Sequence, residues 1–209
     1  TQQASLLNEN EGAALIRLNL IQANLHLQAN QPNQALAGLL TARLLASRSH
    51  FPALVCLVDL KLAETAMELA DWQAFPTHCL RSLEQARTCP EPWLVEKICT
   101  FWVDQQLARR SEPRAVGHCV TSLETARDWF QGEARLAVTR QLARAYSLGL
   151  NQRAKGLGLL ESALRQCKQP KLRVRILAER FSQISPADKL ARRAALLELK
   201  KKKKKLGPL

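Results

Sequence analysis

Aromatic residues and glycines are scarce in this 209-residue chain. Phe, Trp and Tyr together make up 5% of it, and only eight residues are glycine. β-branched residues are also sparse, which argues against strands, whereas the abundant Leu, Ala, Gln and Arg favour helices. Hydrophobic residues still make up 46% of the chain, enough to form a core. The composition therefore predicts an all-α protein.

Long apolar runs and paired-cysteine motifs are absent as well. No stretch of about 18 apolar residues occurs, so no membrane span is expected. The first residues lack a methionine and the layout of a signal peptide, and we expect a processed or excised piece of a longer protein. The cysteines lack CxxC spacing, which predicts reduced, mostly buried thiols in a cytoplasmic or nuclear protein. They are Cys56, Cys79, Cys89, Cys99, Cys119 and Cys167.

Charge is distributed unevenly along the sequence. The chain has a net charge of +13, with 31 basic and 18 acidic residues. From Pro170 onward there are 13 basic residues and only three acidic ones, including the run Lys200–Lys205. The first 169 residues are thus nearly neutral, and the strongly basic end is a separate feature from the predicted fold.

One ten-residue phrase occurs twice, 40 residues apart. His78–Arg87 and His118–Arg127 are identical at seven of ten positions. A looser pattern, Leu-x-x-Leu-x-x-Ala, extends the series to four copies, with Val in place of the first Leu in the third. The copies end at Ala42, Ala86, Ala126 and Ala163, at intervals of 44, 40 and 37 residues. This spacing places the apolar residues on one face of a helix, and recurrence at such a period predicts stacked structural repeats.

A second amphipathic segment precedes each copy of the pattern, with a short break between the two. A pair of helices joined by a short turn packs antiparallel, and such a hairpin buries its apolar face by stacking on the next. We therefore expect four helix pairs in residues 1–169, followed in 170–209 by a capping helix and a basic helix or tail. The predicted first helices are 14–29, 53–69, 93–108 and 134–148, and the C-terminal helices are 171–184 and 187–205.

These units resemble tetratricopeptide-like (TPR-like) repeats. The turn Asn30–Leu36 is similar to that family's turn and second-helix start, Leu69–Ala74 is another version, and Tyr146 keeps the family's aromatic position. Units of about 40 residues are similar to the divergent repeats of maltose-regulator-type activators, the anaphase-promoting complex's fifth subunit and the cohesin loader. The resemblance covers residues 12–168 and implies a right-handed α-α superhelix, an α-solenoid.

The resemblance also implies where a partner would bind. In such stacks the first helix of each pair lines a concave groove, so polar residues on those helices are candidates for binding a peptide segment or another subunit. They are Arg17, Asn24 and Gln28; Lys61, Glu64 and Glu68; Glu96, Thr100 and Asp104; and Arg135, Thr139 and Arg140. The prediction is a scaffold or adaptor within a larger protein or complex.

Catalysis, metal binding and cofactor binding are not predicted. The sequence has no nucleophile motif and no glycine-rich phosphate loop. His78-Cys79 and His118-Cys119 supply zinc-type ligands, but adjacent residues on a helix point about 100° apart and neighbouring helices lie about 8–10 Å apart. Such a set does not converge on one ion.

The lysine run leaves an alternative function open. Lys200, Lys201, Lys202, Lys203, Lys204 and Lys205 could attract nucleic acid or an acidic protein surface, serve nuclear import, or form a solubilising tail. No aromatic residue interleaves with them, so any contact with nucleic acid would be non-specific. The alternative is a nucleic-acid-associated or transcription-regulatory protein.

Overall fold

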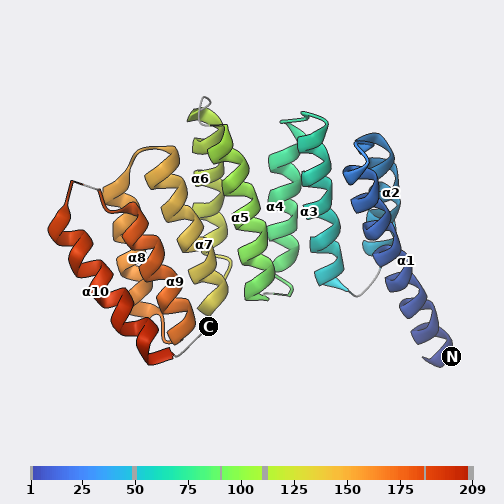
Figure 1. Ribbon diagram of the computed structural model, residues 1–209. Coiled ribbons are helices and arrows are strands. Elements are labelled where there is room, and N and C mark those ends of the chain that lie inside the picture. Colours follow the sequence, from blue (N-terminus) through green and yellow to red (C-terminus); the bar gives the residue numbers. More distant parts are fainter. Residues whose placement is uncertain (1, 49–50, 90, 110–112, 186, 207–209) are drawn as a thin grey trace. The chain divides into compact units, whose positions relative to one another are not determined.

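The computed structural model describes residues 2–48, 51–89, 91–109, 113–185 and 187–206, and all regular structure in these ranges is helical (Figure 1). This confirms the all-α prediction. The helices are α1 (Gln2–Gln28), α2 (Pro32–Ala46), α3 (Pro52–Glu68), α4 (Ala74–Ala86), α5 (Pro92–Ala108), α6 (Pro113–Arg127), α7 (Gly132–Arg144), the π-helical segment η1 (Ala145–Gly149), α8 (Arg153–Gln166), α9 (Pro170–Gln183) and α10 (Lys189–Leu206).

The helices form two compact units, Thr1–Ile98 and Cys99–Leu209. Unit 1 contains α1 to α4 and the first part of α5, and unit 2 contains the rest. The predicted division at residue 169 stays a prediction. Within the ranges that the structure describes, no helix is both long and apolar enough to cross a bilayer.

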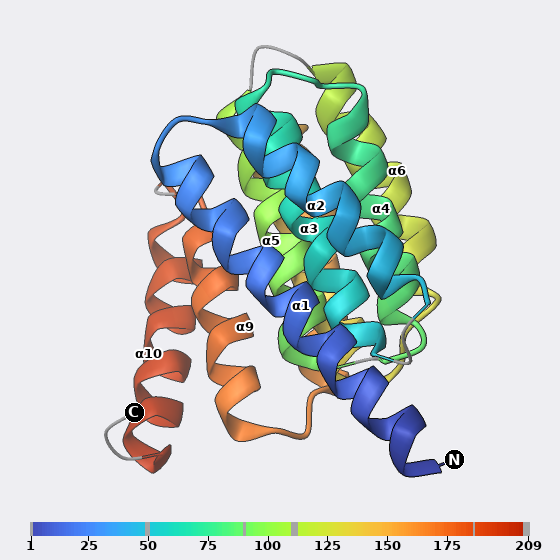
Figure 2. The same cartoon turned by 90° about the vertical axis from the view of Figure 1, so that its right-hand side faces the viewer.

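Two helix hairpins build unit 1, and α1 and α2 lie side by side in the first of them (Figure 2). Its core joins Ile16 of α1 and Leu39 of α2 to Val58 and Leu62 of α3, all four with no exposed surface. The repeated pattern supplies this packing, because its second Leu and its Ala are buried in all four copies. These residues are Leu39 and Ala42, Leu83 and Ala86, Leu123 and Ala126, and Leu160 and Ala163.

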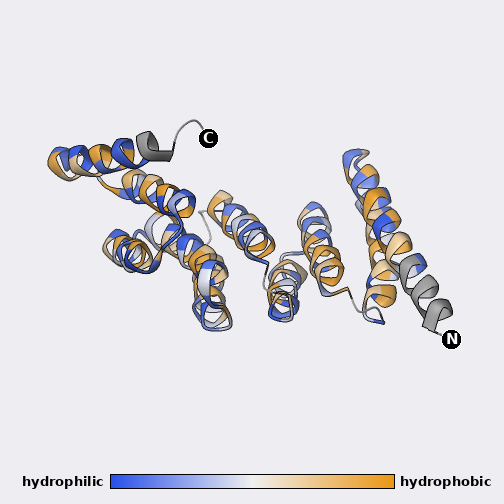
Figure 3. Cartoon of the chain, turned by 90° about the horizontal axis from the view of Figure 1, so that it is seen from below, coloured by the Kyte–Doolittle hydropathy of each residue, from blue (hydrophilic) through white to orange (hydrophobic). Residues whose placement is uncertain are grey.

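The first hairpin is apolar on more than its buried face. Leu18, Ile21 and Leu25 of α1 are 49%, 57% and 59% exposed, and Leu40 and Leu44 of α2 are more than half exposed. In Figure 3, orange is spread along the helix pair nearest the N-terminus. These large apolar side chains lie outside the core of the hairpin and face solvent.

Three of the hairpin turns in the described ranges contain a left-handed residue. Asn30, Ala70 and Asn151 have φ of 56°, 54° and 54°. After Asn30, the Gln31 N–H donates to the His26 carbonyl over 2.8 Å, and Asp71 makes the same bond to Ala66. This is the Schellman ending, which satisfies carbonyls that the helix leaves without partners. Proline at the first helical position then fixes where α2 begins.

Unit 2 has a π-helical turn at the end of the fourth predicted first helix, 134–148. In η1 the Leu150 N–H donates to the Ala145 carbonyl over 3.1 Å, a bond spanning five residues. Gly156 of α8 packs directly against this turn, since a Cβ there would lie 2.7 Å from the Ala143 carbonyl oxygen and would overlap Ser147. Glycine is therefore required for the close approach of α8 to α7 and η1.

The C-terminal helices complete the core of unit 2. Ile176 and Leu177 of α9 and Leu199 of α10 pack with Leu160 and Ala163 of α8. The last helix begins at Lys189, two residues later than predicted, because the Asp188 carboxylate accepts a hydrogen bond of 2.9 Å from the Ala191 N–H and caps it. At the other end, α1 begins at Gln2 and is longer than predicted.

Five of the six cysteines are buried, as predicted, and Cys89 is partly exposed. Burial is the main cause that raises the pKa of the Cys56 thiol to about 12, and it raises the pKa of Cys119 further. These thiols stay protonated at neutral pH and fill small core positions.

Candidate partner-binding surfaces

A row of polar side chains connects three helices of unit 2. The Gln141 side-chain amide on α7 donates to the Thr100 hydroxyl on α5 over 2.8 Å. Arg144, one turn along α7, reaches Asp104 of α5 with Nη2 at 2.7 Å and Glu179 of α9 with Nε at 3.7 Å. Its Nη1 also donates to the Gln141 side-chain oxygen over 2.7 Å. We call these five residues the polar row.

Hydrogen bonds of the buried Gln183 hold the α9 end of the polar row. Gln183 donates from its amide nitrogen to the Glu179 carboxylate over 3.2 Å, and its oxygen accepts from the Ser147 hydroxyl of η1 over 2.7 Å. Gln183 and Ser147 are each 3% exposed. Glu179 is thus held in place through Gln183 and Ser147.

Some of the groove residues predicted on α5 and α7 belong to the polar row, and the others lie outside it. Thr100 and Asp104 belong to the polar row, and Glu96 is partly buried one turn before Thr100. On α7, Thr139 and Arg140 are buried, at 7% and 8% exposure. Arg135 is exposed and bonds Asp128 over 3.2 Å, away from the row.

Sequence reasoning missed Gln141, Arg144, Glu179 and Gln183. A signal for the first two was present in the period: Arg144 follows Asp104 by the same 40 residues that separate the two copies of the repeated phrase. Glu179 and Gln183 lie in the predicted capping helix, where no groove was expected.

In unit 1 the predicted groove residues lie apart from any such row. Arg17, Asn24 and Gln28 are exposed on α1, and Glu68 is exposed on α3. Lys61 and Glu64 of α3 form an ion pair with each other. Lys61 and Glu64 thus pair with each other within their own helix.

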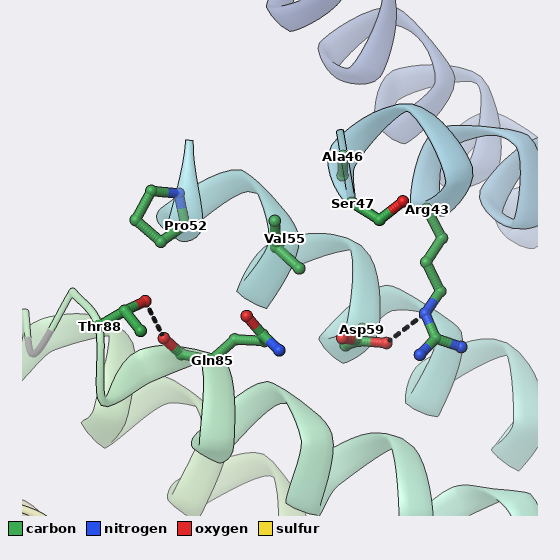
Figure 4. Close-up of a pocket in the computed structure, with 8 residues that line it drawn as sticks. All are labelled: Arg43, Ala46, Ser47, Pro52, Val55, Asp59, Gln85 and Thr88. Carbon is green, nitrogen blue, oxygen red and sulfur yellow. Dashed lines mark hydrogen bonds and ion pairs between the residues drawn. The ribbon is translucent and has the colours of Figure 1, made fainter. Parts of the chain in front are cut away.

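A cavity of about 440 Å³ opens between α2, α3 and α4 in unit 1 (Figure 4). Arg43 and Asp59 face each other in it, with Arg43 Nε 3.3 Å from Asp59 Oδ1. Asp59 is only 2% exposed, and His78 Nδ1 lies 3.9 Å from the same oxygen. A buried carboxylate requires such a partner because desolvation penalises the charge. The remaining lining residues are Ala46, Ser47, Pro52, Val55, Gln85 and Thr88.

The side chains of the two His-Cys dipeptides differ in burial and in their neighbours. Cys79 and Cys119 are fully buried, His118 is exposed, and His78 lies beside Asp59. Among the described residues no group of three or more His, Cys, Asp or Glu side chains is placed to hold a metal ion.

The lysine run continues helix α10. Lys200 and Lys201 are exposed, and Lys202 is partly exposed. The side chains of Lys203, Lys204 and Lys205 lie outside the described part of the chain.

Tyr146, in η1, joins a surface charge cluster. Its hydroxyl donates to the Glu124 carboxylate, and the Lys155 ammonium contacts that hydroxyl and lies 3.9 Å from the ring centroid. The hydrogen bond from Tyr146 is the main cause that lowers the pKa of Glu124, and Lys155 adds to it.

Replacing Tyr146 with Phe should cost about 1 kcal/mol of unfolding free energy at pH 7, since one hydrogen bond to a half-exposed carboxylate is lost. The lowered pKa of Glu124 contributes stability that is present above its unfolded-state value and is lost as pH falls through the folded-state value. The difference between the two proteins should therefore shrink below about pH 4. Urea unfolding at pH 7 and pH 3 measures it, and an undiminished difference in Tyr146→Phe at pH 3 would contradict this assignment.

No protein-family model and no curated protein matches this sequence. Two solved structures are similar to the structure of this chain. They are a Podosopora anserina protein assigned as a kinesin light chain with nearly identical TPR-like repeats, and a point variant of it. The first is 15% identical to this chain, and the match covers 93% of this chain and 97% of the other. The point variant is 14% identical, and the match covers 91% of this chain and 95% of the other. Each has a TM-score of 0.57. The likeness confirms the predicted fold class, a TPR-like α-solenoid.

Proposed function

We propose that this chain is a non-catalytic helical-repeat scaffold that binds an extended segment of a partner protein along the polar row. The observation that carries the proposal is that the row spans three alternate helices, α5, α7 and α9, and that hydrogen bonds of the buried Gln183 hold its α9 end. Binding residues fixed on rigid helices lose little entropy when a ligand arrives.

The row retains hydrogen-bonding capacity for a ligand. The Asp104 side chain is 47% exposed and uses one oxygen for Arg144, so further acceptor positions face solvent. The Arg144 side chain is 21% exposed. An extended peptide presents N–H and C=O groups along its length, which suit such a mixed row of donors and acceptors.

Asp104→Lys should reduce partner binding at least tenfold, because it places a second positive charge beside Arg144. The matched control is Glu84→Lys, which makes the same charge change at an exposed position on α4 of unit 1. Quantitative affinity purification with the three proteins identifies partners, and peptides tiled from each partner give dissociation constants. Equal retention by Asp104→Lys and Glu84→Lys would overturn the proposal.

Exchanging the two charged residues of the Asp104–Arg144 ion pair provides a second test of the proposal. Asp104→Arg with Arg144→Asp restores the ion pair in the opposite direction. The double variant should regain only the stability that this one pair supplies, because Arg144→Asp also removes the contacts with Gln141 and Glu179. Its binding should stay weak because the ligand meets the wrong charges. Recovery of both properties would count against direct contact with the ligand.

A further inference from the structure

A second cavity, of about 190 Å³, opens between α6, α7 and α8 in unit 2. Its lining contains two arginines and three hydrogen-bonding side chains, with no carboxylate. The lining residues are Arg127, Arg135, Leu136, Thr139, Leu159, Ser162, Ala163 and Gln166.

This cavity occupies the same place in its repeat as the unit 1 cavity does in its own. Arg127 follows Ala126 of the repeated pattern as Arg43 follows Ala42. On the next helix, Arg135 and Thr139 lie three and seven residues after the first residue of α7. Val55 and Asp59 lie at the same distances from the first residue of α3.

The two cavities differ in charge. In unit 1, Arg43 follows the repeated pattern and faces the buried carboxylate of Asp59. The position equivalent to Arg135 holds the apolar Val55. In unit 2 the carboxylate is replaced by the hydroxyl of Thr139, and the apolar residue by a second guanidinium, Arg135. The substitution removes one negative charge and adds one positive charge at equivalent points.

Asp128 offsets the unit 2 arginines only in part. Its Oδ1 lies 3.2 Å from Arg135 Nη2 and 3.7 Å from Arg127 Nε, but its side chain is 64% exposed. Two guanidinium groups thus share one solvated carboxylate. The Arg127 Nε is buried and has no hydrogen-bond partner.

Further donors converge on the same space. The Ser162 oxygen accepts a hydrogen bond of 3.3 Å from the Gln166 amide, which leaves the Ser162 hydroxyl hydrogen for a ligand. Guanidinium groups also present paired N–H donors in a geometry that matches oxyanions. The lining is therefore rich in donors and has a positive charge.

We propose that the unit 2 cavity binds a phosphate monoester carried on the side chain of a protein segment. A phosphoryl group has three strong acceptor oxygens and close to two negative charges, which suit two guanidiniums and a hydroxyl. The volume of about 190 Å³ is smaller than the roughly 300 Å³ or more that encloses a whole ligand of drug size, so the phosphoryl group enters the cavity and its carrier stays outside. The proposal does not depend on the polar row, whose residues do not line this cavity.

The experiment is calorimetric titration of the full chain with a phosphoserine peptide, its unphosphorylated form and inorganic phosphate, at two salt concentrations. The phosphopeptide should bind at least tenfold more tightly than the unphosphorylated peptide, and less tightly at higher salt. Inorganic phosphate should compete with it. Stronger binding of inorganic phosphate than of the phosphopeptide would overturn the assignment to a protein segment.

Two variants each place in the unit 2 cavity the residue type that the unit 1 cavity has at the equivalent position. Arg135→Val and Thr139→Asp should each weaken phosphopeptide binding at least tenfold. Arg135 is exposed, so Arg135→Val keeps the test valid if Thr139→Asp does not fold. The control is Arg165→Val, which removes the same charge from an exposed position on α8. Unchanged binding in Arg135→Val, or an equal loss in Arg165→Val, would overturn the proposal.

Discussion

Gly156→Ala should lower the unfolding free energy by about 2 to 3 kcal/mol, the upper part of the range of about 1 to 3 kcal/mol for an extra methyl group in a packed interface. A Cβ at this position would lie 2.7 Å from the Ala143 carbonyl oxygen and would overlap the Ser147 hydroxyl. The carbonyl belongs to the helix backbone and cannot rotate away. Since Ser147 also bonds Gln183 over 2.7 Å, the strain should spread to the α9 end of the polar row.

Gly158→Ala, two residues along the same helix, is the matched control. No atom lies within 4 Å of a Cβ placed there, so the variant should gain up to about 1 kcal/mol from the higher helix propensity of alanine. Urea unfolding followed by circular dichroism measures both variants. A change of the same sign and size at the two positions would contradict the close packing of α8 against η1.

Arg43→Met should cost about 2 kcal/mol of unfolding free energy. It leaves the Asp59 carboxylate, 2% exposed, without the guanidinium that lies 3.3 Å from it. Removing one partner of a fully buried ion pair costs about 3 to 5 kcal/mol, and the expected loss is smaller here because the Arg43 side chain is 34% exposed.

The double variant Arg43→Met with Asp59→Leu should recover most of that loss, because an apolar pair requires no desolvation of charge. The adjoining cavity gives the larger side chain room. Thermal and urea unfolding of the four proteins complete a double-mutant cycle. If Arg43→Met alone were as stable as the parent protein, solvent rather than Arg43 would be stabilising the carboxylate.

The helix pairs were predictable from sequence because they depend on local rules. The Leu-x-x-Leu-x-x-Ala pattern identified the buried face of each second helix, and proline placed the starts of α2, α3, α5 and α9. The π-helical turn at Ala145–Gly149 was not predictable, since no local residue pattern distinguishes it from the α-helix before it.

The candidate site was predictable only in part, for a geometric reason. Thr100 and Asp104 were identified from their spacing on one helix, but their partners depend on the register between helices. A rotation of α7 by one residue decides whether Arg140 or Gln141 faces α5. The two arginine cavities likewise required the structure, because their residues come from three helices each.

The burial of the thiols gives this protein a single accessible point for chemical labelling. Five cysteines lie in the core, and protonation keeps Cys56 and Cys119 unreactive at neutral pH. A maleimide dye would therefore attach at Cys89, in the connection between α4 and α5, without any engineered residue. Such a dye would report ligand binding by fluorescence anisotropy from a position outside both the polar row and the unit 2 cavity.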